Sequence, residues 1–179
     1  MAFFPHPLRR NWDDVSDYVV HFTQDAGGIG AAHHFAAILR AGTIEARNRF
    51  GIGRHFEHCP RAVCLSEAPL HQLKRIADRR SQYGLGFRKT TILDRGGGPV
   101  FYAYNDQGHA LREIMEAEQA NGAHAIWRAA AFVEQPRPRN AFEWEREWRV
   151  PGDLQFPPDL LAFMTAPEDE HIDMRAFFR

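Results

Sequence analysis

The chain has 179 residues, the length of one compact domain or of two small ones. Hydrophobic residues make up 44% of it and charged residues 25%, the proportions of an ordinary globular protein rather than of a disordered chain. Its 22 Lys and Arg residues nearly balance its 23 Asp and Glu residues, so the formal net charge of −1 excludes a strongly basic chain but not a local basic patch.

The first third of the chain predicts two strands with a short helix between them. Residues 18–23 are β-branched and aromatic, which predicts a strand. Residues 34–40 carry apolar side chains at helical spacing, and Gly42 is placed to end that helix. Residues 46–60 show no period and predict a loop, which could serve as a lid over a cofactor. Residues 62–66 have the pattern of a buried strand.

The middle of the chain predicts helices around a hairpin. Pro69 suits the first turn of a helix that carries an apolar stripe. Residues 88–93 and 100–104 are rich in β-forming residues, and the glycines between them predict a hairpin. Residues 109–133 form the longest helical pattern, which Asn121 and Gly122 interrupt.

Two more strands are expected near the C-terminal end, over residues 142–150 and 160–164. Short strands mixed with segregated helices favour an α+β fold over a doubly wound parallel sheet. We therefore expect a single α+β domain over residues 1–179.

The sequence favours a cytoplasmic protein without a metal site or a membrane partner. No apolar run approaches the ~20 residues of a membrane span, and the N-terminal residues lack the order of a signal peptide. Cys59 and Cys64 give no disulfide framework. His55 and His58 have plausible zinc-ligand spacing with these cysteines, but Cys64 lies inside an apolar strand pattern, where a thiol behaves as a small hydrophobe.

The segment over residues 143–150 is the most informative for chemistry. Alternation along a strand predicts that Trp148 faces a core while Glu145, Glu147 and Arg149 share the opposite face with Glu143. Adjacent carboxylates repel one another unless solvent or a cation relieves them. The face is therefore either the exposed side of an edge strand or the wall of a cleft, and a third reading is a Mg²⁺-dependent nuclease site built from the three carboxylates.

Three further segments place polar or aromatic groups at strand ends or turns. His21 and Thr23 share a face at the end of the first strand. Ser66 ends the next buried strand, where loops often carry function. Tyr83 and Phe87 flank a pair of glycines. Each of these positions is equally consistent with a purely structural role.

Taken together, several segments resemble the AbiGi-type abortive phage-resistance proteins. The segments are His-Phe-Thr at 21–23, Ile-Leu-Arg-Ala-Gly at 38–42, Val-Cys-Leu-Ser-Glu at 63–67, Tyr-Gly-x-Gly-Phe-x-Lys at 83–89 and Glu-Trp-Arg at 147–149. The first two are also similar to the start of DarT-like toxins, which belong to the ADP-ribosyltransferase superfamily.

The superfamily resemblance implies a split, bent β core with flanking short helices that binds NAD. It implies that Glu147, or Glu145 on the same face, is the catalytic residue. It also implies a set of NAD contacts: His21, Thr23, Ser66, Tyr83 and Phe87. Cleavage of the bond between nicotinamide and ribose passes through an oxocarbenium-like cation, which a carboxylate stabilises.

The expected function is that of an NAD-dependent ADP-ribosyltransferase acting as a toxin or phage-defence effector. The acceptor would be a nucleic-acid base or a protein, and a cognate toxin or antitoxin would be a partner. Arg47, Arg49 and Arg54 are candidates to contact the acceptor or the NAD pyrophosphate. The alternative is a non-catalytic antitoxin or phage-sensing module on the same scaffold, since AbiGi-type proteins have been labelled as antitoxins.

Overall fold

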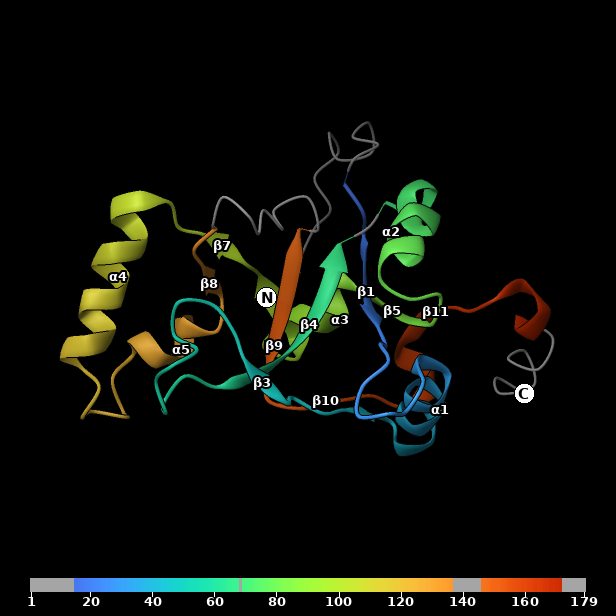
Figure 1. The fold of residues 1–179 in the computed structure, drawn as a ribbon, viewed down its shortest axis with the longest axis horizontal. Coiled ribbons are helices and arrows are strands. Elements are labelled where there is room, and N and C mark those ends of the chain that lie inside the picture. The colour runs from blue at the N-terminus through green and yellow to red at the C-terminus, as the bar shows by residue number, and fades with distance from the viewer. Residues whose placement is uncertain (1–14, 68, 137–145, 172–179) are drawn as a thin grey trace. The chain divides into compact units, whose positions relative to one another are not determined.

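The computed structural model describes residues 15–67, 69–136 and 146–171, and within these ranges the chain forms two compact units (Figure 1). The first unit draws on residues 1–43, 65–94 and 155–179, and the second on residues 44–64 and 95–154. The expectation of one domain over the whole chain stays a prediction. The α+β class is confirmed in its broad form, because the structure combines short helices with a mainly antiparallel sheet.

Antiparallel strands form the centre of the first unit. Strand β1 (Tyr18–Phe22) pairs along its whole length with β5 (Gly84–Arg88), and β5 pairs with β11 (Leu161–Thr165). The other edge of β1 meets the end of β4 (Arg61–Glu67), where Val20 lies opposite Ser66. The strands predicted over 18–23, 62–66 and 160–164 are therefore confirmed.

The core of the first unit forms around the β-branched residues of β1. Val19 and Val20 are fully buried, and Val20 packs with Phe22 and Ile76 in one cluster. Residues with branched or aromatic side chains suit this position because they fill both faces of a pleated strand. The strand pattern at the start of the chain thus predicts both the element and its burial.

The helices of the first unit begin and end near the predicted points. Helix α1 (Ala31–Ala41) begins where Asp25 Oδ1 accepts a hydrogen bond from the Ala31 N–H at 2.7 Å. It ends at Gly42, whose φ of 60° is the left-handed conformation that glycine adopts without a Cβ clash. The helix predicted after Pro69 is present as a 3₁₀ turn η2 (Leu70–Gln72) followed by α2 (Leu73–Arg79). The first unit also contains two short 3₁₀ turns, η4 (Pro158–Leu160) and η5 (Glu168–Glu170).

The hairpin predicted from residues 88–93 and 100–104 is wrong. The strand of this region is β5, and Lys89–Asp94 form helix α3 instead. Strand β6 (Gly98–Pro99) pairs with β9 (Glu147–Pro151), and β7 (Phe101–Tyr102) pairs in parallel with β8 (Val133–Glu134). Intrinsic strand preference is a weak guide here because burial of Lys89 and Ile92 decides the conformation.

The second unit combines the remaining short strands with two helices. Strand β3 (Asn48–Arg49) pairs with β4, and β6 pairs with β9 (Glu147–Pro151). Strands β2 (Thr43–Ile44) and β10 (Leu154–Gln155) each lie where the chain passes from one unit to the other. The interrupted helical pattern over 109–133 is confirmed as α4 (Asn105–Ala117) and α5 (Ile126–Ala130). The buried residues of these helices pack with residues of neighbouring segments in one apolar cluster: Ile52, Cys59, Ala103, Met115, Trp127, Ala130 and Val133.

The burial of strand β9 differs from the alternation of buried and exposed side chains expected for the acidic segment. Trp148 and Val150 are buried as predicted, but Arg149 between them is also buried, with 1% of its surface exposed. The strand is thus enclosed on both faces at this point, and the idea of a wholly exposed charged face is wrong at Arg149. Glu143 and Glu145 lie outside the described residues.

Candidate functional site

A buried arginine organises the polar side chains at the start of β9. The Arg149 guanidinium makes two parallel hydrogen bonds to Glu147, from Nε to Oε1 at 2.9 Å and from Nη2 to Oε2 at 2.8 Å. Nη2 also donates to Oε2 of Glu134 at 2.9 Å, and Nη1 donates to the Ala131 carbonyl at 2.8 Å. Because the donors of a guanidinium lie in one rigid plane, this pairing holds the Glu147 carboxylate in one orientation.

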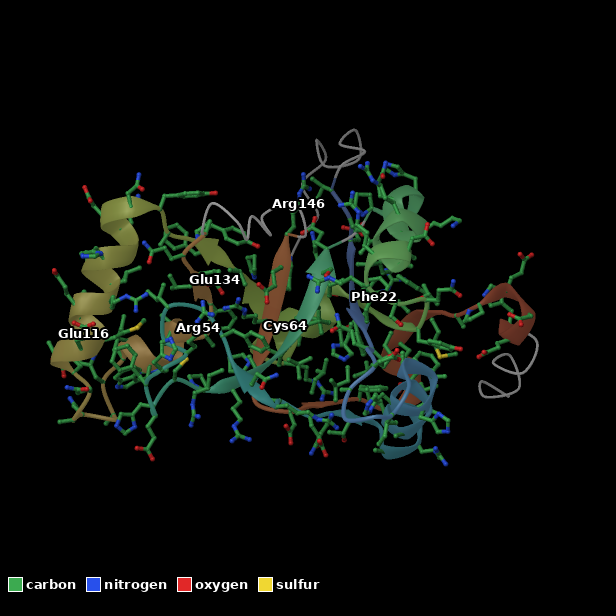
Figure 2. The ribbon with its side chains drawn as sticks, viewed as in Figure 1. Phe22, Arg54, Cys64, Glu116, Glu134 and Arg146 are labelled. Atoms are coloured by element: carbon green, nitrogen blue, oxygen red, sulfur yellow. The ribbon has the colours of Figure 1, made fainter. Side chains whose placement is uncertain are left out.

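A second arginine extends this group of charges. Arg54 donates from Nη2 to Oε1 of Glu134 at 3.1 Å, and Figure 2 shows these two side chains on neighbouring segments of the second unit. We call Glu147, Arg149, Glu134 and Arg54 the arginine network. Its two positive and two negative charges balance, which reduces the cost of burying them.

The backbone around residue 51 approaches this network closely. Gly51 has a φ of +74°, and a Cβ at that position would collide with the Val133 carbonyl. The next residue, Ile52, donates its N–H to the same carbonyl at 3.0 Å. The Phe50 ring lies over Arg149, with the guanidinium carbon 5.2 Å from the ring centroid. Glycine at position 51 therefore allows the loop to pack against the network.

The network also sets the ionisation of its neighbours. Burial lowers the pKa of Arg149, but the hydrogen bonds and charge of Glu147 outweigh burial, and the net shift is upward. Burial raises the pKa of the Cys64 thiol well above its ordinary value, and the Glu147 carboxylate raises it further. Arg149 is therefore permanently charged and Cys64 stays a thiol, which argues against a nucleophilic role for this cysteine.

Glu147 is the candidate catalytic residue that the structure describes. Its side chain is 17% exposed, and each carboxylate oxygen accepts one hydrogen bond from Arg149. A carboxylate oxygen has two lone pairs, so each can accept a further hydrogen bond from a ligand hydroxyl. A fixed, partly exposed carboxylate of this kind can stabilise a developing cation. Glu145, the other catalytic candidate, lies outside the described residues.

The three arginines predicted to contact an acceptor or a pyrophosphate are engaged within the second unit. Arg47 forms an exposed ion pair with Glu45 at 3.2 Å. Arg49 donates to two backbone carbonyls of its own loop, at 2.8 and 3.1 Å. Arg54 belongs to the arginine network. Arg49 and Arg54 thus stabilise the segment over 46–60. The sequence predicts this segment as a loop, but it contains strand β3, and its role as a lid stays a prediction.

Two of the candidate NAD contacts are joined to each other in the first unit. Thr23 is buried, its N–H donates to the Tyr83 carbonyl at 3.0 Å, and its hydroxyl donates to the Ala31 carbonyl at 3.0 Å. The Tyr83 hydroxyl donates to Oε1 of Glu170 at 2.7 Å. That hydrogen bond raises the pKa of Tyr83 to about 12. Thr23 is therefore a positioning residue for the turn between β1 and α1.

The other three candidates differ in how accessible they are. His21 is half-buried and lies opposite Leu85 in the pairing of β1 with β5. Ser66 is 8% exposed on β4. Phe87 is fully buried, and its ring packs edge-on against Phe156 at a centroid distance of 5.2 Å. Stacking of Phe87 on a nicotinamide ring is not possible in this arrangement, because the core already covers its ring.

A buried ion pair in the first unit was not foreseen. Lys89 Nζ lies 2.7 Å from Glu67 Oε1, and both side chains are 8% exposed. The Ser16 N–H also donates to Glu67 Oε1, at 3.3 Å. Both residues lie in segments that the sequence had singled out, at 63–67 and 83–89, but nothing in either segment indicates that they pair.

The described residues contain neither a cluster of metal ligands nor a helix that could span a membrane. No three His, Cys, Asp or Glu side chains come together there as metal ligands. Within the same residues, no helix has the length and apolar character needed to cross a bilayer. Comparisons with protein-family models, with curated proteins and with solved structures gave no match.

Proposed function

We propose that the chain is an NAD-dependent ADP-ribosyltransferase of a toxin or phage-defence system. The observation that carries the proposal is the geometry of Glu147, a partly exposed carboxylate fixed by a two-point hydrogen bond to buried Arg149. An oxocarbenium-like transition state needs a negative charge that is already oriented before the bond breaks. The order of motifs similar to AbiGi-type and DarT-like proteins supports the same reading.

The proposed reaction transfers ADP-ribose from NAD to an acceptor. The bond between nicotinamide and the ribose C1′ breaks, and its electron pair leaves with nicotinamide. Glu147 accepts a hydrogen bond from a ribose hydroxyl and stabilises the positive charge that develops. A nucleophilic atom of the acceptor then bonds to C1′ and loses its proton. We propose a nucleic-acid base as the acceptor, with a protein side chain as the other possibility.

Of the proposed NAD contacts, His21 and Tyr83 are the first to test. Both are half-buried, whereas Thr23 and Ser66 are buried. Phe87 is not carried forward, because its ring is enclosed in the core. His21 offers a ring nitrogen and Tyr83 a hydroxyl and an aromatic face, which are suitable groups for the ribose and the rings of NAD.

A transfer assay with labelled NAD tests the catalytic assignment. Glu147→Gln keeps one of the two hydrogen bonds from Arg149, through the amide oxygen, and should abolish transfer to nucleic acid and to protein in a chain that circular dichroism shows to be folded. Glu134→Gln is the matched control because it removes the other carboxylate bound to the same guanidinium. That control should keep most of the transfer activity. Full transfer by Glu147→Gln would refute the assignment.

The same ion pair also favours a second candidate function, that of a non-catalytic antitoxin or phage-sensing module. Arg149 occupies both oxygens of Glu147, as expected of a purely structural carboxylate. A binding module predicts that NAD does not bind and that Glu147→Gln leaves partner capture intact. Transfer activity in the wild-type chain would exclude this alternative.

A further inference from the structure

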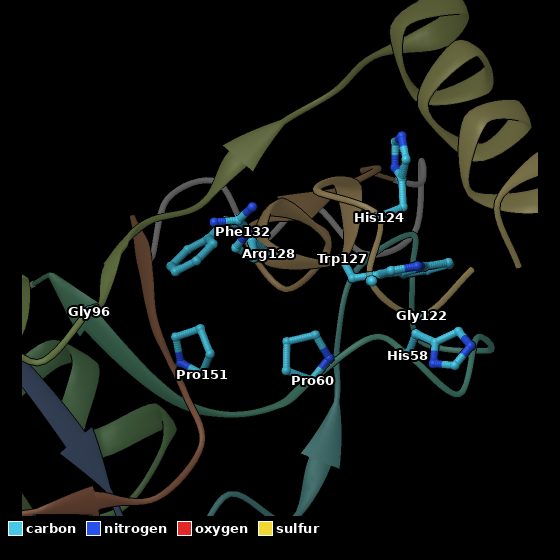
Figure 3. Close-up of a pocket in the computed structure, with 10 residues that line it drawn as sticks. His58, Pro60, Gly96, Gly122, His124, Trp127, Arg128, Phe132 and Pro151 are labelled. Carbon is cyan, nitrogen blue, oxygen red and sulfur yellow. The ribbon is translucent and has the colours of Figure 1, made fainter.

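The second unit contains a hollow of about 450 Å³ whose lining residues are separate from the arginine network. Figure 3 shows Arg128 and Phe132 along one wall and Pro60 and Pro151 along the other. Trp127 lies at one end of this space. The hollow is open to solvent, and its walls are more apolar than polar.

Among the described residues, one permanently charged side chain, that of Arg128, lines the hollow. Arg128, His58 and His124 line it, and no carboxylate is among the described lining residues. Arg128 is exposed, and within the described chain no ion pair or side-chain hydrogen bond engages its guanidinium. Among the sequence neighbours of the lining residues, Arg61 and Arg95 are cationic and Glu57 is anionic, so the charge on the hollow itself is that of Arg128. A ligand that complements this surface carries negative charge.

One end of the hollow is held in place by close packing. A Cβ at Gly122 would lie 2.7 Å from the Cε1 and Nδ1 atoms of the exposed His58 side chain, so glycine lets the imidazole lie in this position. The His58 ring lies 5.5 Å from the Trp127 ring. Trp127 in turn donates its Nε1–H to the Asn121 carbonyl at 2.9 Å. Trp127, buried and hydrogen-bonded, is thus in place before any ligand binds.

We propose that this hollow binds a nucleotide, with the base against the apolar walls and the phosphate on Arg128. A flat aromatic base packs well against Phe132 and the two prolines, and a guanidinium pairs with phosphate through two parallel hydrogen bonds. The ligand is either a free nucleotide or one nucleotide of a nucleic-acid strand. None of the lining residues is assigned to NAD or to catalysis, so this inference does not rest on the proposed transferase activity.

Calorimetry with 5′-AMP tests the site on the full chain. AMP should bind saturably, and Arg128→Glu should weaken binding about tenfold or more, because a charge-assisted hydrogen bond is lost and replaced by repulsion. Arg75→Glu is the matched control, an exposed arginine on α2 in the first unit. It should bind AMP like the wild type. Circular dichroism of both variants checks that the fold is kept.

Adenosine and ribose 5-phosphate test the base contact and the phosphate contact separately. An oligonucleotide tests whether the site takes a free nucleotide or a nucleic-acid strand. Adenosine and ribose 5-phosphate should each bind more weakly than AMP, because each lacks one of the two contacts. A short oligodeoxyadenylate should bind more tightly than AMP, with a steep salt dependence, if the site takes a strand. Tighter binding of AMP than of the oligonucleotide would assign the site to free nucleotides. Either result supports the nucleotide assignment, provided that Arg128→Glu weakens it.

Several results would overturn the proposal. Wild-type protein that is folded but does not bind AMP would do so, as would equal affinity for AMP and ribose 5-phosphate, which would indicate a simple anion site. Loss of AMP binding in His21→Ala, with binding kept in Arg128→Glu, would place the nucleotide at the proposed NAD contacts instead. Absence of ADP-ribosyl transfer, by contrast, would leave the AMP result unchanged.

Discussion

At the scale of single residues, Arg149 decides what the acidic strand can do. The alternation of β9 predicts that Arg149 and Glu147 share a face, and the structure agrees. The sequence could not predict that this face is enclosed at Arg149, because the carboxylate of Glu134 and the Phe50 ring come from segments far away along the chain. The described carboxylate of this strand, Glu147, thus belongs to a charge-balanced network in which Arg54 is the most exposed member.

Removal of this arginine should destabilise the protein strongly. Arg149→Leu leaves Glu147 half-buried without its cation and Glu134 with Arg54 alone, and loss of one partner of a buried ion pair costs about 3–5 kcal/mol in the free energy of unfolding. Urea unfolding followed by circular dichroism measures this change. The control is Arg47→Leu, which removes one half of an exposed pair and should change stability by less than about 1 kcal/mol. Equal effects of the two substitutions would contradict the network's role.

Tyr83 gives a prediction about pH. Its hydrogen bond to the Glu170 carboxylate stabilises the neutral phenol and raises its pKa to about 12. Because the pKa in the folded protein is above its ordinary value of 10, this contribution to stability is complete below pH 10 and is lost as the pH rises through about 12. In Glu170→Gln the phenol should ionise at lower pH than in the wild type. Difference absorbance of tyrosinate during a pH titration tests this, and identical titration curves would contradict it.

At the scale of elements, the sequence predicts most helices and strands where local signals and burial agree. Strand β1 and helix α1 are examples, since a β-branched run and a capping glycine each act within a few residues. Helix α3 is the counterexample, because its Thr-Thr-Ile-Leu run favours a strand by composition. The buried ion pair between Lys89 and Glu67 lies at its first residue, and a contact between segments this far apart in sequence has no local signature.

The pairing of β5 with β11 depends on a small residue. Gly86 lies opposite Phe163, and a Cβ at position 86 would come within 2.5 Å of the Phe163 ring. Gly86→Ala should therefore cost about 1–3 kcal/mol of stability through overpacking. Gly98→Ala is the control, because its nearest neighbour is the Phe132 ring at 3.7 Å, an ordinary contact. Thermal unfolding compares the two, and equal melting temperatures for both variants would contradict this packing.

At the scale of the whole molecule, the sequence predicts the α+β class but not the division into two compact units. Contact between segments defines such units, and both are assembled from separate stretches of chain. The proposed NAD contacts His21 and Tyr83 belong to the first unit, and Glu147 belongs to the second. The hollow lined by Arg128 had no sequence signal, because its lining comes from separate short segments without a motif.

Calorimetric titration of the purified wild-type protein with NAD is the measurement that decides whether the chain binds this substrate. We expect saturable binding in the micromolar range, an ordinary affinity for an enzyme substrate. Binding should be lost in His21→Ala and kept in the surface variant Arg75→Glu. Absence of binding by the folded wild-type protein at millimolar NAD would contradict the transferase proposal and leave the binding-module alternative.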